Sequence, residues 1–351
     1  MLLKIKFCVD KFRAIKHNIR MEFFYKREDK TTNYRWFKNS YLIDYVKNST
    51  LTKKQKEDLK KYVNLAIHIL KKRQISPNNT FKIIDKFAKH IDKYRGKNFT
   101  YRLSEYVYKN DSKIYVIEPP CGSNTTIIKS QNDYIFIDTG YAIYKREMIE
   151  IIDKITGGFD KIYKRALLTH ADVDHAGLLN DFDEVLLSDK SRKNYLLESE
   201  NKRDFREINP LQLPYVKICK ILTNYKPLSV EKAKVIAKSD DGKLEPLYKV
   251  SELRFGDFNF DIYYGQGGHL PGEIVLIDYG NKVVFSGDIF VNLKGYTKEQ
   301  EKYNKCAPLL LNSVDTNQEL CKIERNYLLS LLNGGNWRVF SGHGKAKEIS
   351  V

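Results

Sequence analysis

The sequence feature that most constrains the fold is a dense group of metal-capable side chains directly after a buried-type strand. The strand at 165–169 leads into the motif HADVDHAG, which carries His170, Asp172, Asp174 and His175. We expect this motif to form a loop that opens a helix. Alternation along an extended segment predicts that the first three of these side chains share one side, and that His175 turns in at the helix start. Such a cluster is suited to holding two cations side by side.

Three further candidate ligands follow short strands downstream. They are His269 in GGHLPG, Asp288 in FSGD and His343 in FSGHG. Every histidine after residue 90 falls in one of these motifs or in the first one. Histidines that serve only packing would not be expected to gather in this way. The pattern therefore favours one shared site.

Strands and helices alternate around these motifs. An amphipathic helix carries apolar residues between 143 and 155 and is closed by Gly157-Gly158. Short apolar runs separated by turn residues predict strands at 113–118, 125–129, 134–137, 165–169, 184–188, 258–264, 273–278, 282–286 and 337–341. This interleaving predicts a mixed α/β sandwich.

The N-terminal part has a different texture. Thr52 is a suitable N-cap for a helix to about Arg73, and Pro77-Asn78-Asn79 separates it from a second helix ending at Gly96. Before them, the stretches FFYKR (23–27) and YRWFK (34–38) mix aromatic and basic residues. These could stack on nucleic-acid bases or form a small core with a basic rim. His17, His68 and His90 have no partner at ligand spacing.

Positive charge is concentrated in the same part. Residues 1–110 hold 28 Lys/Arg and 10 Asp/Glu, whereas residues 111–351 hold 33 and 34. We therefore predict a basic, mostly helical domain or cap at 1–105 and a catalytic domain at 106–351, in which 189–250 is an insertion or cap. The excess suggests a polyanionic partner such as nucleic acid or an anionic membrane surface. The alternative is lysines that are merely solvated.

Composition excludes several other classes. Hydrophobic residues make up 42% and charged residues 30%, which is typical of globular proteins. No run of 18 apolar residues occurs, and charges near the start interrupt any secretory signal. Five scattered cysteines argue against a disulfide scaffold. We expect a cytoplasmic protein with no membrane span.

Taken as a set, these motifs resemble the metallo-β-lactamase-fold superfamily. The pattern of that family is H-x-H-x-D-H, then Gly-His, Gly-Asp and a final Gly-His. An Asp-Thr-Gly at the end of an early strand is matched by Asp138-Thr139-Gly140. The resemblance covers about residues 111–351. It implies a four-layer αββα sandwich with a metal centre at one edge between the sheets.

The resemblance also implies roles for individual residues. One metal would be bound by His170, Asp172 and His269, and a second by Asp174, His175 and His343, with Asp288 bridging them. Asp174 would in addition orient the attacking water. Asp138 would hold a ligand loop or hydrogen-bond to a ligand histidine.

One position departs from the family pattern, because Asp172 stands where the second histidine is usual. A carboxylate is a harder ligand than imidazole, so iron or manganese becomes an alternative to zinc, which is the expected ion. The extra negative charge should also weaken the pull of the centre on an anionic substrate.

The implied activity is hydrolysis of an ester, thioester, lactone, amide or phosphodiester bond by a hydroxide that bridges two divalent ions. Two alternatives stay open. In the first, a nuclease or phosphodiesterase binds nucleic acid through residues 1–105. In the second, a di-iron centre resembling the flavodiiron core reduces oxygen or nitric oxide, although that core usually has glutamate at this position. Lys345, Tyr263 and Tyr264 lie near ligand motifs, where we expect them to serve packing.

Overall fold

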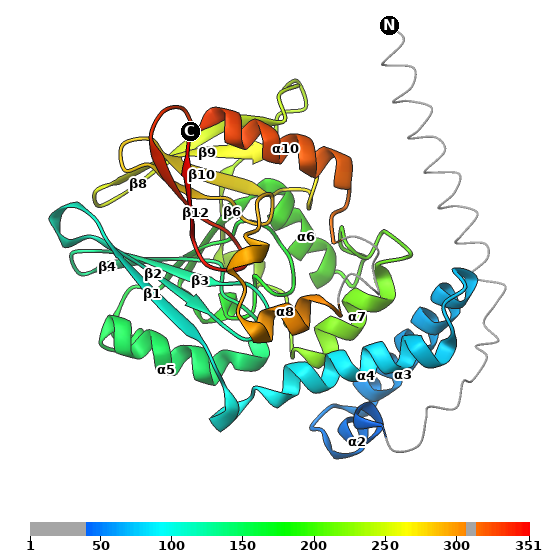
Figure 1. The fold of residues 1–351 in the computed structure, drawn as a ribbon. Coiled ribbons are helices and arrows are strands. Elements are labelled where there is room, and N and C mark those ends of the chain that lie inside the picture. Colours follow the sequence, from blue (N-terminus) through cyan, green and yellow to red (C-terminus); the bar gives the residue numbers. More distant parts are fainter. Residues whose placement is uncertain (1–39, 307–313) are drawn as a thin grey trace, which may run out of the picture.

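Two β-sheets face each other in the middle of the molecule, and helices cover their outer faces (Figure 1). The computed structural model describes residues 40–306 and 314–351. The predicted four-layer αββα sandwich is thereby confirmed. The stretches 23–27 and 34–38, together with His17, lie outside the described residues.

The first sheet has seven strands in sequence order. They are β1 (Arg102–Val107), β2 (Lys113–Glu118), β3 (Thr125–Ser130), β4 (Asp133–Ile137), β5 (Arg165–Leu167), β6 (Glu184–Ser188) and β7 (Ala233–Ala237). The first four pair antiparallel, and β4 to β7 run parallel.

The second sheet has six strands in the order β13-β12-β11-β10-β9-β8. They are β8 (Leu247–Phe255), β9 (Phe258–Gly265), β10 (Ile274–Asp278), β11 (Val283–Phe285), β12 (Asn336–Phe340) and β13 (Lys347–Ser350). Only β11 and β12 pair in parallel.

The α-helices complete the layers. They are α2 (Tyr41–Asn48), α3 (Lys53–Lys72), α4 (Pro77–Lys93), α5 (Lys145–Thr156), α6 (Asp189–Ser199), α7 (Leu213–Leu222), α8 (Lys298–Asn304) and α10 (Gln318–Leu331). Helix α5 lies outside the first sheet and α10 outside the second (Figure 1).

Three apolar cores hold the layers together, one between the sheets and one outside each sheet. Residues such as Ile128 and Leu276 meet between the sheets. Ile152 of α5 belongs to the core outside the first sheet. Leu328 of α10 packs with Trp337 outside the second. Burial of this apolar surface is the main stabilising term.

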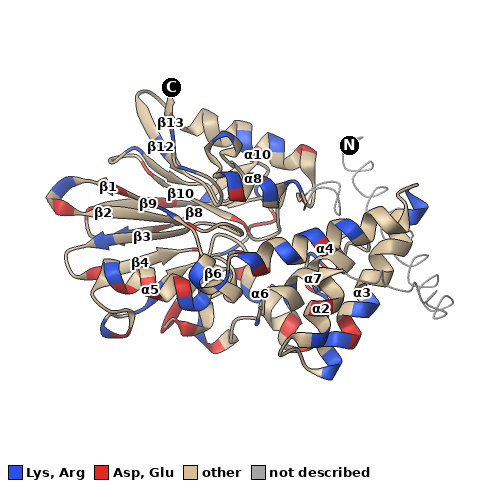
Figure 2. Ribbon diagram, turned by 60° about the horizontal axis from the view of Figure 1, so that its bottom comes forward, with Lys and Arg blue, Asp and Glu red and all other residues tan. Residues whose placement is uncertain are grey.

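Helices α2, α3 and α4 contribute side chains to the apolar core outside the first sheet, the same core that contains Ile152. Thr52 caps α3 in a capping box with Gln55, as the sequence predicts. Helix α4 begins at Pro77, earlier than expected, because Ser76 caps it and proline is well tolerated in the first turn. Helix α3 packs against α4 and α7. Lys and Arg line the outer sides of α3 and α4 (Figure 2).

The strand ends position the site. Asp138 follows β4, and the HADVDHAG motif follows its parallel neighbour β5. Asp288 follows β11, and His343 follows its parallel neighbour β12. Since carboxyl ends of parallel strands meet at one edge of a sheet, these motifs are brought to the same edge of the sandwich.

Two sequence-based expectations about elements are wrong. Residues 170–177 form turns rather than an extended segment, and no α-helix follows them; only the short 3₁₀ turn Leu179–Asp181 forms. The region 189–250, predicted as an insertion or cap, contains α6, α7, β7 and the start of β8. Four strands, β1, β7, β8 and β13, were not predicted, because most of their side chains are half-buried or exposed.

Two further observations bear on the predicted class. In the described part of the chain, no helix combines the length and the apolar character needed to span a membrane. Cys121, Cys219, Cys306 and Cys321 are buried free thiols. The predicted boundary near residue 105 stays a prediction, and β1 already belongs to the first sheet.

Candidate metal centre

The structure brings all seven predicted ligand residues together at one edge of the sandwich. Potential ligand atoms fall into three groups, and within each group they lie within 4.8 Å of one another. The groups are His170, Asp172 and His269; Asp174, His175 and His343; and His170, His175 and Asp288. The first two match the ligand sets implied by the family pattern. We call them the first site and the second site.

Three buried atoms at the centre of this cluster lack hydrogen-bond partners among the described residues. They are Nε2 of His170, Nε2 of His175 and Oδ1 of Asp288. Buried polar atoms almost always have a partner. Imidazole nitrogens and carboxylate oxygens are also the usual ligands of divalent transition metals. The donor set therefore fits a cation.

Two of the histidines are oriented by carboxylates through their other ring nitrogen. Nδ1 of His175 lies 2.8 Å from Oδ2 of Asp138, and Nδ1 of His269 lies 2.9 Å from Oδ1 of Asp315. A carboxylate that accepts the Nδ1 proton leaves Nε2 as a lone-pair donor facing the centre. Asp315 was not identified from the sequence, because no motif surrounds it.

The other two histidines are oriented by neutral acceptors. Nδ1 of His343 lies 3.1 Å from the Gly122 carbonyl oxygen. Nδ1 of His170 lies 3.0 Å from Oγ1 of Thr169, whose own proton is donated to Asp138. All four rings thus direct Nε2 inward, which is the arrangement that a metal-binding histidine needs.

Asp138 ties two of these elements together. Its Oδ1 accepts from the Thr169 backbone N–H at 2.9 Å, and its Oδ2 accepts from Thr169 Oγ1 at 2.8 Å and from His175. Its backbone lies in the left-handed region with φ 55°. Both interactions expected for Asp138, with the ligand loop and with a ligand histidine, are therefore present.

The ligand loop is folded by tight turns. The Asp172 N–H donates to the His170 carbonyl at 3.0 Å, and the His175 N–H donates to the Asp172 carbonyl at 3.2 Å. The loop then passes close to the Asp-Thr-Gly turn. A Cβ atom on Gly177 would lie 2.4 Å from the Gly140 carbonyl oxygen, so only glycine fits there.

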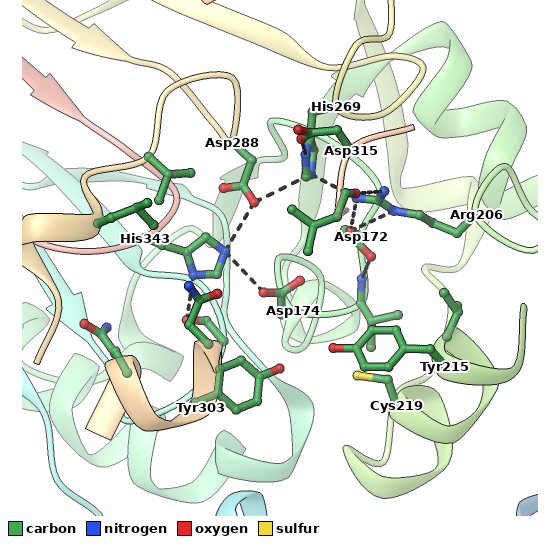
Figure 3. Close-up of a pocket in the computed structure, with 18 of the residues that line it drawn as sticks. Asp172, Asp174, Arg206, Tyr215, Cys219, His269, Asp288, Tyr303, Asp315 and His343 are labelled. Carbon is green, nitrogen blue, oxygen red and sulfur yellow. Dashed lines mark hydrogen bonds and ion pairs between the residues drawn. The ribbon is translucent and has the colours of Figure 1, made fainter. Parts of the chain in front are cut away.

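Asp288 lies between the two sites. Its Oδ2 is 3.3 Å from Nε2 of His343 and 3.6 Å from Nε2 of His269 (Figure 3). Its backbone N–H donates to Oε1 of buried Glu273 at 2.6 Å. Glu273 was not identified from the sequence, although it directly follows the GGHLPG motif that contains His269. A position between both sites is what a bridging ligand requires.

Arg206 is a third residue that the sequence did not reveal. Its side chain, only 6% exposed, donates from Nε and Nη2 to Oδ2 of Asp172 at 3.0 and 2.5 Å. Nη2 also lies 2.9 Å from Nε2 of His269 (Figure 3). The first site is therefore in direct contact with a guanidinium group.

Burial and neighbouring charges set the protonation of the carboxylates. Burial raises the pKa of Asp174. For Asp172, burial alone would raise the pKa, but the Arg206 guanidinium and the neighbouring histidines together outweigh it and hold the pKa below its usual range. For Asp288, burial is likewise outweighed by His343 and His175, so its pKa lies well below the usual value.

A cavity of about 400 Å³ opens in front of these side chains. Tyr215 and Tyr303 lie at one end of it, with their hydroxyl groups turned toward each other and Cys219 beside them (Figure 3). Its walls come mainly from residues 204–219 and 288–304, and no described residue between 40 and 105 lines it. Tyr263, Tyr264 and Lys345 are absent from its lining.

The N-terminal helices support the cavity from behind. Phe87 of α4 packs against the rings of both Tyr215 and Tyr303, with centroids 5.6 and 5.5 Å away. His90 of α4 bonds through Nε2 to the Glu299 carbonyl oxygen of α8 at 3.1 Å. Tyr215 of the predicted cap segment 189–250 and Tyr303 of α8 therefore line the cavity, and α4 packs behind both.

Comparison with solved structures finds many of similar fold at low identity. One is a metallo-beta-lactamase from Pontibacter korlensis, with 15% identity and a TM-score of 0.43 over 70% of this chain and 94% of that one. Another is an archaeal metallo-beta-lactamase superfamily protein from Sulfolobus tokodaii, with 16% identity and a TM-score of 0.39 over 66% and 79%. No curated protein matches the sequence.

A family model gives the assignment. The model described as the metallo-beta-lactamase superfamily matches residues 119–300, just over half of the chain. The match begins directly after β2 and ends in the first turn of α8, and it contains every predicted ligand except His343. The chain belongs to the metallo-beta-lactamase superfamily.

Proposed function

We propose that this protein is a metal-dependent hydrolase of a small molecule that carries an ester, thioester, lactone or phosphodiester bond. Members of the superfamily are generally metal-dependent hydrolases. The observation that carries the proposal is the set of three buried, unpartnered ligand atoms on His170, His175 and Asp288. Asp288 lines the cavity, and the ligand atoms of His170 and His175 lie within 4.8 Å of its carboxylate, so a cation held there would face a substrate in the cavity.

The proposed ligands come from the seven residues predicted from the sequence, and zinc is the proposed ion, with iron or manganese as alternatives. A bound divalent ion supplies a hydroxide near neutral pH and polarises a carbonyl or phosphoryl oxygen. Asp174 lines the cavity, and its Oδ2 lies 3.3 Å from Nε2 of His343. It is therefore placed to accept a proton from the attacking water and orient it. Asp138 keeps the ring of His175 in the required tautomer.

The cavity favours a small substrate with an apolar part. Its volume falls in the range of small-molecule pockets. Tyrosine, valine and cysteine side chains form one wall, and burial raises the pKa of Tyr215 and Tyr303, so both hydroxyls stay neutral. A neutral aromatic wall opposite a cationic centre suits an acyl or aromatic group whose reactive oxygen faces the ions.

The two alternative functions, nucleic-acid cleavage and di-iron reduction, are supported by fewer observations. The nucleic-acid role of residues 1–105 stays a prediction, and salt-sensitive binding of DNA or RNA by the intact protein would be its test. The di-iron alternative relied on Asp172 as a hard ligand. Because Asp172 contacts Arg206, its carboxylate has a second explanation that does not involve iron.

The hydrolase proposal is tested with His170→Ala, Asp174→Ala and Asp288→Ala. We expect each variant to lose hydrolysis of chromogenic esters, thioesters, lactones or phosphodiesters while its circular dichroism spectrum is retained. His68→Ala on α3 is the matched control, since His68 does not line the cavity, and it should keep full activity. Full activity in the three site variants would show that the assignment is wrong.

A further inference from the structure

The two halves of the candidate metal centre differ in how many of their ligand atoms are already engaged. In the first site, Oδ1 of Asp172 accepts from the Val173 N–H at 2.8 Å and Oδ2 accepts from Arg206. Nε2 of His269 also faces Arg206. Of the three ligands of this site, only His170 has an unpartnered ligand nitrogen.

The second site is different. Nε2 of His175 and Oδ1 of the bridging Asp288 have no hydrogen-bond partner among the described residues. Nε2 of His343 faces only the carboxylates of Asp174 and Asp288, at 3.3 Å each. No arginine or lysine is paired with these ligands in the described part of the chain. The ligand atoms of the second site are therefore available to a metal cation, whereas Asp172 and His269 of the first site already contact the Arg206 guanidinium.

A guanidinium and a metal ion cannot share the first site. An ion bound there would lie about 2.0–2.2 Å from both Oδ2 of Asp172 and Nε2 of His269. Nη2 of Arg206 already lies 2.5 and 2.9 Å from the same two atoms. Two positive groups in the same small, buried space would repel each other strongly. Either the arginine leaves or the ion does not bind.

Arg206 is held in this place by the surrounding fold. Its Nη1 donates to the Val314 carbonyl oxygen, which adds a third anchor. The loop on either side is fixed by Lys220 of α7, which pairs with Asp204 and with Glu207. The buried side chain of Arg206 thus has three partners, and ion pairs hold the loop that carries it. We conclude that the fold fixes Arg206 in this position.

We infer that the guanidinium of Arg206 takes the place of the first metal ion, so that the chain binds one ion, in the second site. This inference rests on the proposed function. It explains why an aspartate stands at position 172, since a carboxylate offers a guanidinium an opposite charge as well as a hydrogen bond, whereas a neutral imidazole offers only the hydrogen bond. Arg206 then supplies a fixed positive charge beside the cavity, which favours negative charge that develops on a substrate oxygen.

The test is a metal titration of stripped protein with zinc, followed by gel filtration and elemental analysis. We expect wild type to retain one zinc per chain and Arg206→Leu to retain two, because the variant frees Asp172 and His269. Arg325→Leu is the matched control. Arg325 also lines the cavity, but it donates to the Ile289 carbonyl oxygen and contacts none of the proposed ligands. The Arg325→Leu variant should retain one zinc per chain, as wild type does.

A second measurement does not depend on any variant folding. Anomalous diffraction at the zinc edge from wild-type crystals should give one peak, beside His175 and His343, with Arg206 still against Asp172. Two tightly retained ions in wild type, or a second peak with Arg206 displaced, would overturn this inference and leave the proposed function intact. A folded Arg206→Leu variant that retains one zinc would overturn it as well. Wild type that retains no metal would instead remove the proposed function.

Discussion

Replacing Asp138 with asparagine should weaken metal binding without reshaping the backbone. The carboxylate makes three hydrogen bonds, to the Thr169 N–H at 2.9 Å, the Thr169 hydroxyl at 2.8 Å and Nδ1 of His175 at 2.8 Å. Asparagine tolerates the left-handed backbone at this position as aspartate does, so no strain is added. The perturbation is therefore confined to charge and hydrogen bonding.

The magnitude follows from the three donors that surround the carboxylate. An asparagine has one acceptor oxygen, so its NH₂ must face either the Thr169 N–H or the His175 side. The variant loses one charge-assisted hydrogen bond, and the asparagine NH₂ then faces another N–H donor. Together these changes should lower the free energy of unfolding by about 2–3 kcal/mol. If the ring of His175 escapes by changing tautomer, its Nε2 gains a proton and cannot bind metal. We therefore expect metal affinity to fall about 10–100-fold.

Two assays separate these effects. Urea denaturation of the metal-free protein measures the loss of stability, and competition with a chromophoric chelator measures metal affinity. Asp257→Asn is the control, because Asp257 accepts from Ser112 and Asn110 at 2.6 and 2.7 Å but does not line the cavity. Its metal affinity should be that of wild type. If Asp138→Asn also binds metal like wild type, the reasoning about His175 is refuted.

Two other changes test the supports of the site. Gly177→Ala should destabilise the fold by about 3 kcal/mol or more in thermal or urea unfolding, because the new Cβ would lie 2.3 Å from the Ala142 backbone nitrogen. Gly242→Ala meets only a side-chain oxygen at 3.1 Å and should be within about 0.5 kcal/mol of wild type; equal effects of the two would contradict the packing argument. Burial raises the pKa of Glu324, which accepts from the Gly267 and Gly268 N–H groups, from 4.5 to about 7. The protonated form then favours folding, so its contribution is present below pH 4.5 and is lost as pH rises to about 7. Compared with Glu324→Gln, wild type should lose about 3 kcal/mol of unfolding free energy across that interval, and a pH-independent difference between the two proteins would refute this.

Much of the fold was predictable because local signals coincide with the elements. Thr52 and Gln55 form the expected capping box, and the apolar run at 184–188 forms β6 with the expected bounds. The 170–177 loop was not predictable from alternation. Backbone bonds between His170 and Asp172, and between Asp172 and His175, curl it into turns. The alternation of side chains along the sequence does not predict such backbone hydrogen bonds.

The sequence by itself determined the family, the chain order of the seven candidate ligands and the strand ends that bring them to one edge. These depend on residue type and on short-range pattern, which a single sequence displays. Only the tertiary structure decided that Arg206 meets Asp172 and His269, which are 34 and 63 positions away in the chain. That meeting depends on how α7 and the loop before it pack against the sandwich. No local motif encodes such packing, so the contact on which our inference about the number of ions rests became visible only in three dimensions.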